Sequence, residues 1–136
     1  MSAVEIVTSF YQSDLANDDN VIPDFFHEEC ELHWTSSQGF VLLTYNDIVN
    51  FFKDTRKSYT NLRFEFTHLI EAGDSVSTRH TLFAKTIENP DSEVVLAHFS
   101  TIWEVKDGKL YRGYEISHQA NENDSASMKS YAERKI

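Results

Sequence analysis

Apolar residues recur at helical spacing near the start of the chain and alternate with polar residues through most of its second half. Within residues 3–15 an apolar side chain returns every three or four positions, which predicts an amphipathic helix running to about Asn17. Ser2 and Glu5 match the capping-box pattern at the start of this helix. A second, shorter helix is predicted over residues 20–29, where an asparagine cap is followed by a proline in the first turn.

The middle of the chain combines two short alternating segments with a third helix. Residues 30–35 and 39–43 alternate in polarity and predict a pair of strands. Thr44 and Asp47 form a second capping-box pattern, which predicts a helix that extends toward Tyr59.

Four strand-like segments follow, separated by the turn signals Ala-Gly-Asp, Asn-Pro-Asp and Asp-Gly: residues 61–71, 74–88, 92–106 and 108–119. Strands joined by such short turns are antiparallel neighbours. Helices in the first half and strands in the second predict an α+β fold, in which a curved antiparallel sheet wraps around the N-terminal helices and encloses a pocket. We assign residues 1–120 to this one domain and residues 121–136 to a polar tail, with a helix from Ser125 as one alternative.

Composition and charge narrow the classes of partner. The 136 residues carry 12 basic and 22 acidic side chains, a net charge of -10, which argues against nucleic acid and against an anionic membrane surface as partners. The single cysteine, Cys30, cannot form an internal disulfide, and its two glutamate neighbours argue against a nucleophilic thiol. No signal peptide and no apolar run of about 20 residues is visible, so we expect a cytoplasmic location.

Three segments, in this order and spacing, carry a family resemblance. They are an aromatic helix end with an acidic break, Phe-Tyr-Gln-Ser-Asp-Leu-Ala-Asn-Asp-Asp, an aromatic helix leading into a strand, Phe-Phe-His-Glu-Glu-Cys-Glu-Leu-His-Trp-Thr, and a closing hairpin, Val-Lys-Asp-Gly-Lys-Leu-Tyr-Arg-Gly-Tyr-Glu. With them the chain resembles the SnoaL-like group of the NTF2-like superfamily over residues 3 to 118. The resemblance implies a cone-shaped domain with an internal pocket. It does not fix the chemistry, because the family includes isomerases, dehydratases, epoxide hydrolases, polyketide cyclases and members without known activity.

The last strand poses a question about which of its faces points inward. The resemblance implies that the inward residues are Tyr111, Gly113, Glu115 and Ser117. Periodicity alone favours the opposite face, which carries Leu110, Tyr114 and Ile116 and is the more apolar of the two. Both patterns are satisfied if a second subunit buries the outer face, and dimerisation through that face is common in the family. We therefore expect a homodimer.

Three residues are candidates for catalysis. Glu115 resembles a pocket carboxylate of similar epoxide hydrolases, and an acid walled in by aromatic rings has a raised pKa that suits acid/base work. Tyr11 resembles the oxyanion-hole tyrosine of similar ketosteroid isomerases. His80 shares strand parity with inward residues and could pair with Glu115. The alternatives are a solvated or ion-paired glutamate, a core tyrosine and a structural strand histidine.

At several positions the chain lacks the catalytic residues of the similar isomerases and epoxide hydrolases, and this limits the reactions that we expect. The position of the isomerase general base falls on Trp34 or Thr35, and that of its second pocket acid falls on Thr101. The Arg/Asp pair of the epoxide hydrolases falls on Leu82 and Ala84. The two pocket histidines of the dehydratases are only loosely suggested, by His80 with His33 or His98. These departures favour a non-catalytic binding or dimeric domain as the alternative function.

The remaining candidates would bind an apolar small molecule. Pocket walls are expected from five aromatic residues, although core packing explains them equally well: Trp34, Phe25, Phe52, Phe99 and Trp103. Tyr111, Gly113, Ser117 and Thr101 are expected to complete the binding surface. No phosphate loop, nucleophile motif or tight metal-ligand spacing is present in the sequence, so we expect no cofactor and no metal.

Overall fold

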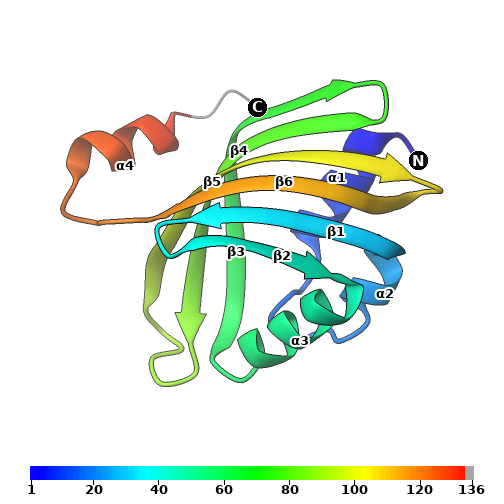
Figure 1. Cartoon of the computed structure of the whole chain (residues 1–136). Coiled ribbons are helices and arrows are strands. Elements are labelled where there is room, and N and C mark those ends of the chain that lie inside the picture. Colours follow the sequence, from blue (N-terminus) through cyan, green and yellow to red (C-terminus); the bar gives the residue numbers. More distant parts are fainter. Residues whose placement is uncertain (134–136) are drawn as a thin grey trace.

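The structure, a computed structural model, describes residues 1–133 and has an α+β architecture, as the sequence predicted. One curved sheet of six strands holds three helices on its concave side, and a fourth helix lies against the opposite face (Figure 1). The helices are α1 (Ala3–Gln12), α2 (Val21–Phe25), α3 (Tyr45–Thr55) and α4 (Ser125–Ala132). The strands are β1 (Phe26–Ser36), β2 (Gly39–Thr44), β3 (Tyr59–Ala72), β4 (Ser75–Thr86), β5 (Glu93–Lys106) and β6 (Lys109–Gln119).

The strand order across the sheet is β2-β1-β6-β5-β4-β3. Strands β3 to β6 form an antiparallel meander, as their short turns predicted. The hairpin of β1 and β2 joins this meander through a parallel pairing of β1 with β6. The first and the last strand of the chain are therefore neighbours, and the sheet continues over the side on which α3 packs.

Local chemistry explains where the helices start and stop. Both capping boxes are present, Ser2 with Glu5 at the start of α1 and Thr44 with Asp47 at the start of α3. Helix α1 ends at Gln12, earlier than predicted, because both the backbone N–H and the hydroxyl of the next residue, a serine, donate to the carbonyl of Phe10. Helix α2 also ends earlier, at residue 25, and α3 ends at residue 55, so Tyr59 opens a strand.

Bulges give the sheet its curvature. The pairing register shifts by one residue at Thr60 and Thr67 in β3, at Leu96 in β5 and at Tyr111 in β6. Each extra residue bends its strand and increases the local twist. A long sheet with several such bends curls around the helices instead of lying flat.

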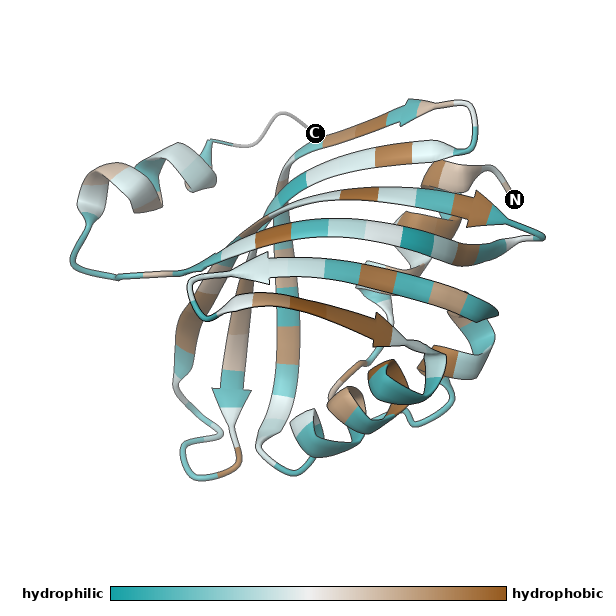
Figure 2. Cartoon of the chain, in the orientation of Figure 1, coloured by the Kyte–Doolittle hydropathy of each residue, from teal (hydrophilic) through white to brown (hydrophobic). Residues whose placement is uncertain are grey.

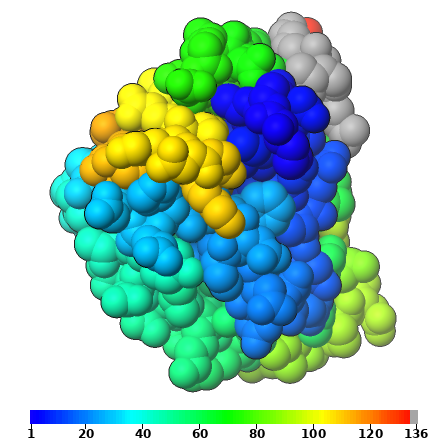
Figure 3. Space-filling view, turned by 90° about the vertical axis from the view of Figure 1, so that its right-hand side faces the viewer, coloured from blue at the N-terminus to red at the C-terminus, as the bar shows by residue number. Residues whose placement is uncertain are grey.

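The turn before β6 and the bulge within it set the orientation of this strand. Asp107 and Gly108 both have positive φ, 54° and 73°, as the predicted tight Asp-Gly turn requires. The N-terminal residues of the chain lie beside this turn, on the face of the molecule shown in Figure 3. Leu110 is fully buried and pairs with Val105, whereas Tyr111 is the extra residue.

The core lies between α1, α2 and the concave face of the sheet. Phe10 is its centre: its ring contacts the rings of Tyr11, Phe26 and Trp103 at centroid distances of 5.0, 5.3 and 6.0 Å. Val7 and Leu110 are completely buried beside this cluster. Edge-to-face aromatic packing of this kind adds to the stabilisation from buried apolar area.

The outer face of the sheet is divided into a covered and an exposed part. Helix α4 lies against β3 and over parts of β4 and β5. Tyr131 stacks on His98 at 3.9 Å between ring centroids, and Arg79 lies over the same tyrosine ring at 3.7 Å. The exposed part, on β2, β6 and β5, carries apolar side chains. Phe40 and Ile116 are 59% and 64% exposed, and Figure 2 shows the hydrophobic run along β2.

The helices of the described chain are short. Between residues 1 and 133 no helix is long and apolar enough to cross a membrane.

Candidate functional site

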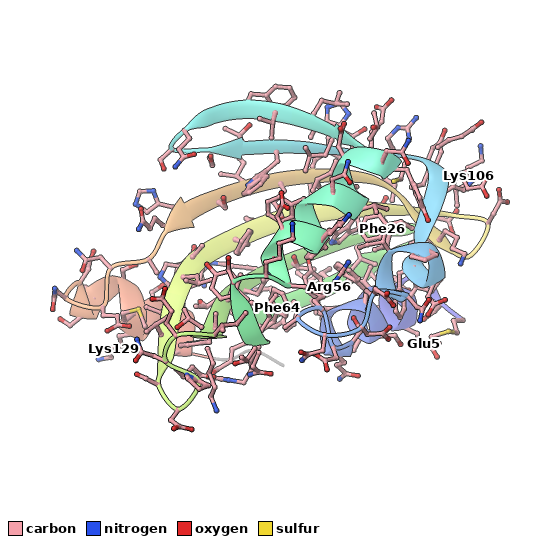
Figure 4. All side chains as sticks on the ribbon, turned by 90° about the horizontal axis from the view of Figure 1, so that it is seen from below. Glu5, Phe26, Arg56, Phe64, Lys106 and Lys129 are labelled. Carbon is pink, nitrogen blue, oxygen red and sulfur yellow. The ribbon has the colours of Figure 1, made fainter. Side chains whose placement is uncertain are left out.

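A cavity of about 260 Å³ lies between the concave face of the sheet and the helices α1 and α3. Its wall is almost entirely apolar, and ten of its lining side chains are Phe, Tyr or Trp. Phe26 and Phe64, both labelled in Figure 4, contribute from β1 and β3. This volume is slightly below the usual range of ligand pockets, so the space suits a small molecule.

Glu115 lies in the wall of this cavity. The β6 bulge sets this orientation, because beyond the extra residue the positions Gly113, Glu115 and Ser117 face inward. Thr101, its partner across β5, donates a hydrogen bond to Oε1 at 2.9 Å. Burial raises the pKa of the Glu115 carboxyl to about 7, against a smaller lowering by the Thr101 hydrogen bond.

His80 lines the same cavity from β4 and is 1% exposed. Its ring stacks on Phe99, with centroids 5.1 Å apart and planes within 5°, and Nδ1 lies 3.1 Å from the hydroxyl of Thr78. Burial lowers the pKa of His80 to about 3, so the imidazole is neutral at physiological pH. One strand separates β4 from β6, and in the register His80 is in line with Phe99 and Ser117, whereas Glu115 is in line with Thr101 and Thr78. Two strand spacings and two residues along the strand therefore separate the backbone positions of His80 and Glu115, roughly 12 Å. The two groups can therefore reach opposite ends of one small ligand.

Tyr11 joins the polar part of the wall from α1. Trp103 Nε1 donates a hydrogen bond to the Tyr11 hydroxyl at 2.9 Å, and the hydroxyls of Thr78 and Thr101 also hydrogen-bond to it. Burial, together with the nearby Glu115, raises the pKa of Tyr11, so it stays a neutral phenol. A neutral phenol can donate a hydrogen bond to an oxygen that gains negative charge.

Trp34 is held in place by Ser117. Its indole Nε1 donates to Ser117 Oγ at 2.8 Å, and in the parallel pairing of β1 with β6 it stands directly beside Glu115. The ring meets Phe51 of α3 edge to face at 5.6 Å. Ser117 orients the Trp34 wall of the cavity and does not itself line it.

The other predicted wall residues divide into two groups. Phe52, Phe99 and Trp103 line the cavity. Phe25 does not: α2 ends at this residue, and its ring packs behind the wall, against Phe10 at 6.0 Å. The next residue, Phe26, is the one that enters the cavity, because the change from helix to strand lies between the two.

Two predicted residues of β6 do not form part of the cavity surface. The structure places Tyr111 outside the cavity, because it is the extra residue of the bulge; its ring packs under Arg112 at 3.9 Å and against His27. Gly113 does face inward, but its Cα is covered: a Cβ there would lie 2.6 Å from the Trp103 ring. The lack of a Cβ at this position allows the Trp103 ring and Leu32 to approach the strand closely, so Gly113 offers no surface to a ligand.

Thr101 and the other candidate histidines occupy supporting or outer positions. Thr101 is buried behind Glu115 and does not line the cavity. His33 bonds to Glu31 at 3.1 Å, and His98 lies under α4. In residues 1–133, His80 is the only histidine that lines the cavity. The pair of pocket histidines found in similar dehydratases is therefore not formed by His80 with His33 or His98.

Several lining residues were not singled out from the sequence. Phe51 lies three positions after Ile48 on α3, and Leu62 and Phe64 alternate along β3. Helical and strand periodicity could have found all of them. The bulge residue Leu96 could not be found this way, because its inward direction depends on a register shift.

Within residues 1–133 no three His, Cys, Asp or Glu side chains come together in a way that could hold a metal ion. The Cys30 thiol is buried in β1, and burial raises its pKa to about 11, so it is not a nucleophile in this state. The chemistry available to the cavity is therefore that of a carboxyl group, a neutral imidazole and a phenol.

Comparisons with known proteins agree on the fold. The family model of the SnoaL-like domain matches residues 7–113. No curated protein matches the sequence. Among solved structures, the chain is similar to IdmH, a proposed polyketide cyclase from Streptomyces antibioticus, with a TM-score of 0.68, 12% identity and coverage of 97% of this chain and 99% of that one. An LEH-like epoxide hydrolase of M. tuberculosis gives a TM-score of 0.67 at 13% identity, with 85% of this chain and 81% of that chain covered.

Proposed function

Because this chain belongs to the SnoaL-like domain family, we propose that its cavity binds a small, mostly apolar molecule and performs acid/base chemistry on it without a cofactor. The reaction would be of the isomerase, dehydratase or hydrolase type. Structures similar to this chain include a proposed polyketide cyclase and an epoxide hydrolase, so more than one of these reactions suits the fold.

One observation carries the proposal: a single carboxyl group, Glu115, opens into an otherwise apolar cavity with a pKa of about 7. A group with this pKa is present in both protonation states near neutral pH, which is the condition for an efficient general acid or base. Thr101 occupies Oε1 and fixes the orientation of the carboxyl group. Oε2 is then the oxygen that exchanges a proton with the ligand.

The two other polar groups would assist. Tyr11 would donate a hydrogen bond to an oxygen that becomes negative during the reaction. His80 would accept or donate a hydrogen bond at the far end of the ligand as a neutral imidazole, since its pKa of about 3 excludes the charged form at neutral pH. Trp34, Phe52, Phe99 and Trp103 would enclose the apolar body and exclude water.

The test uses small neutral substrates for two of the reaction types. The parent and Glu115→Gln are assayed for hydrolysis of styrene oxide and for isomerisation of 3-cyclohexenone to its conjugated form, and binding of each compound is measured by calorimetry. Loss of a general acid or base is expected to reduce turnover by about 10²- to 10⁴-fold while binding is retained. Equal turnover and equal binding in the two proteins would reject a functional Glu115.

The alternative is a ligand-binding or structural homodimer without catalysis. It is favoured by the exposed apolar part of the outer sheet face, on which Phe40, Ile102, Tyr114 and Ile116 are each at least 41% exposed. A second copy would bury these side chains, and α4 would limit its position to β2, β1, β6 and β5. Light scattering of the parent and of Ile116→Asp tests this: a dimer that becomes a monomer supports it, and a monomeric parent contradicts it.

Two further assignments accompany the proposal. Residues 1–120 would form the functional domain, with residues 121–136 as an appended tail that includes α4. The single cysteine fits a reducing compartment, and we propose a cytoplasmic location for the protein.

A further inference from the structure

The described part of the cavity wall carries one group that can be negatively charged and none that is positively charged near neutral pH. Among the side chains of residues 1–133 that line the cavity, Glu115 is the only one that is charged near neutral pH. The described part of the chain contributes no lysine and no arginine to this wall. Arg56, labelled in Figure 4, follows the end of α3 and does not line the cavity either.

Among residues 1–133, no cationic side chain lines the cavity together with Glu115. The other titratable groups in the cavity wall are the phenol of Tyr11 from α1, the neutral imidazole of His80 from β4 and the phenol of Tyr59 from the start of β3. The lining side chains of β1, β2, β5 and α3 contain no titratable group. Only Thr101, behind the wall, compensates the carboxylate, with one hydrogen bond.

An ionised carboxylate in apolar surroundings is costly unless a positive charge accompanies it. An anionic ligand would add a second negative charge, and this wall offers no donor with a positive charge to offset it. A cationic ligand would supply the missing partner. The aromatic rings around the carboxylate, among them Trp34, Phe99 and Trp103, attract cations through their faces.

From this arrangement we propose that the ligand of the cavity is a small organic cation, a protonated amine on an apolar body, held by the Glu115 carboxylate and the aromatic wall. This names the class of ligand for the site and rests on the proposed function. It also predicts the direction of proton exchange. A protonated amine binds the ionised form of Glu115. Binding at low pH therefore requires the Glu115 carboxyl group to release its proton, so the affinity for the amine rises with pH. A neutral ligand of the same size binds the protonated form better, so its affinity falls.

Three compounds of nearly equal size separate these cases: benzylamine as the cation, benzyl alcohol as the neutral compound and benzoate as the anion. Their binding to the full chain is measured by calorimetry at pH 6 and pH 8, one unit on either side of the Glu115 pKa of about 7. The ionised fraction of Glu115 rises about tenfold between these values, so benzylamine should bind up to about tenfold more tightly at pH 8. Benzyl alcohol should bind more weakly at pH 8, and benzoate should not bind at either pH.

Two variants assign the effect to this carboxyl group. Glu115→Gln keeps the size and removes the charge, so benzylamine should lose its advantage and its pH dependence while benzyl alcohol still binds. Glu88→Gln removes a carboxylate from the exposed loop between β4 and β5 and should behave as the parent does.

Benzyl alcohol binding at least as tightly as benzylamine at pH 8 would overturn the proposal and leave the binding of a neutral apolar ligand intact. Tight binding of benzoate would also overturn it. If none of the three compounds binds, both this proposal and the ligand-binding function are wrong.

Discussion

Replacing Glu115 with glutamine should make the protein more stable at neutral and alkaline pH, although it removes a candidate functional group. The folded protein holds this carboxyl group in apolar surroundings, where the charged form is unfavourable. In the unfolded chain the same group is in water and ionises at its ordinary pKa. Glutamine has nearly the same shape and never ionises, so the variant avoids the cost of the buried charge.

The magnitude follows from the pKa. Burial raises the pKa of Glu115 from 4.5 to about 7, and each unit corresponds to about 1.4 kcal/mol. Because the folded-state pKa is the higher one, the contribution is favourable below pH 4.5 and is lost as pH rises through 7. The free energy of unfolding of the parent should therefore fall by up to about 3 kcal/mol relative to the variant across this range. Water in the cavity would reduce the figure, since Glu115 borders open space.

The assay is urea unfolding of both proteins at several pH values from 4.5 to 8, at one protein concentration so that any association contributes equally. Other carboxylates titrate in both proteins and cancel in the difference. Glu88→Gln, with its carboxylate in an exposed loop, is the control and should show a constant difference from the parent.

A difference between parent and Glu115→Gln that stays flat from pH 4.5 to pH 8 would refute the reasoning. It would mean that the carboxylate is fully hydrated in the folded protein or is paired with a cation. In either case the raised pKa, and with it the acid/base role, would have no basis.

Three further substitutions test neighbouring features. Gly113→Ala would place a methyl group 2.6 Å from the Trp103 ring, so we expect a loss of about 1–3 kcal/mol in the free energy of unfolding, and an unchanged urea midpoint would show that the indole moves aside. Thr101→Val removes the 2.9 Å hydrogen bond to Glu115, so the pKa of Glu115 should rise further, as followed by NMR of its carboxyl carbon; a constant pKa would mean that water replaces the hydroxyl. Tyr131→Ala removes the ring that holds α4 on the sheet, so amide exchange should accelerate in α4 and not in β5, and equal protection in α4 would contradict the contact.

Much of the fold could be predicted because its signals are local. A capping box needs only Ser2 and Glu5, and a hairpin turn needs only Asp107 and Gly108, whose positive φ angles the structure confirms. Alternation of polarity over long segments identified the four meander strands, and their short turns fixed the antiparallel order. The parallel pairing of β1 with β6 joins segments about 80 positions apart, and no local sequence pattern predicts it.

The site was predictable where side chains follow regular periodicity and was mispredicted where they do not. Glu115, His80 and Tyr11 all line the cavity, although their roles are proposals. The error at Tyr111 arose because parity was counted through a bulge, and the error at Phe25 because the helix was expected to continue past it. Both depend on a change of backbone geometry at one residue, which a count of apolar positions does not detect.

The extra residue in β6 has a consequence for tolerated changes of length. Leu110 and Gly113 both face inward although they are three positions apart, because Tyr111 has no partner of its own on β5. A gene that lost the codon for Tyr111 would encode a strand of regular alternation, with the same side chains inward as before. Loss of the codon for Tyr114 would turn the acid at position 115 to the outside and bring an isoleucine in. In related lineages, a deletion at the first position could leave the cavity unaltered, whereas one only three codons later would exchange its acid for a hydrocarbon.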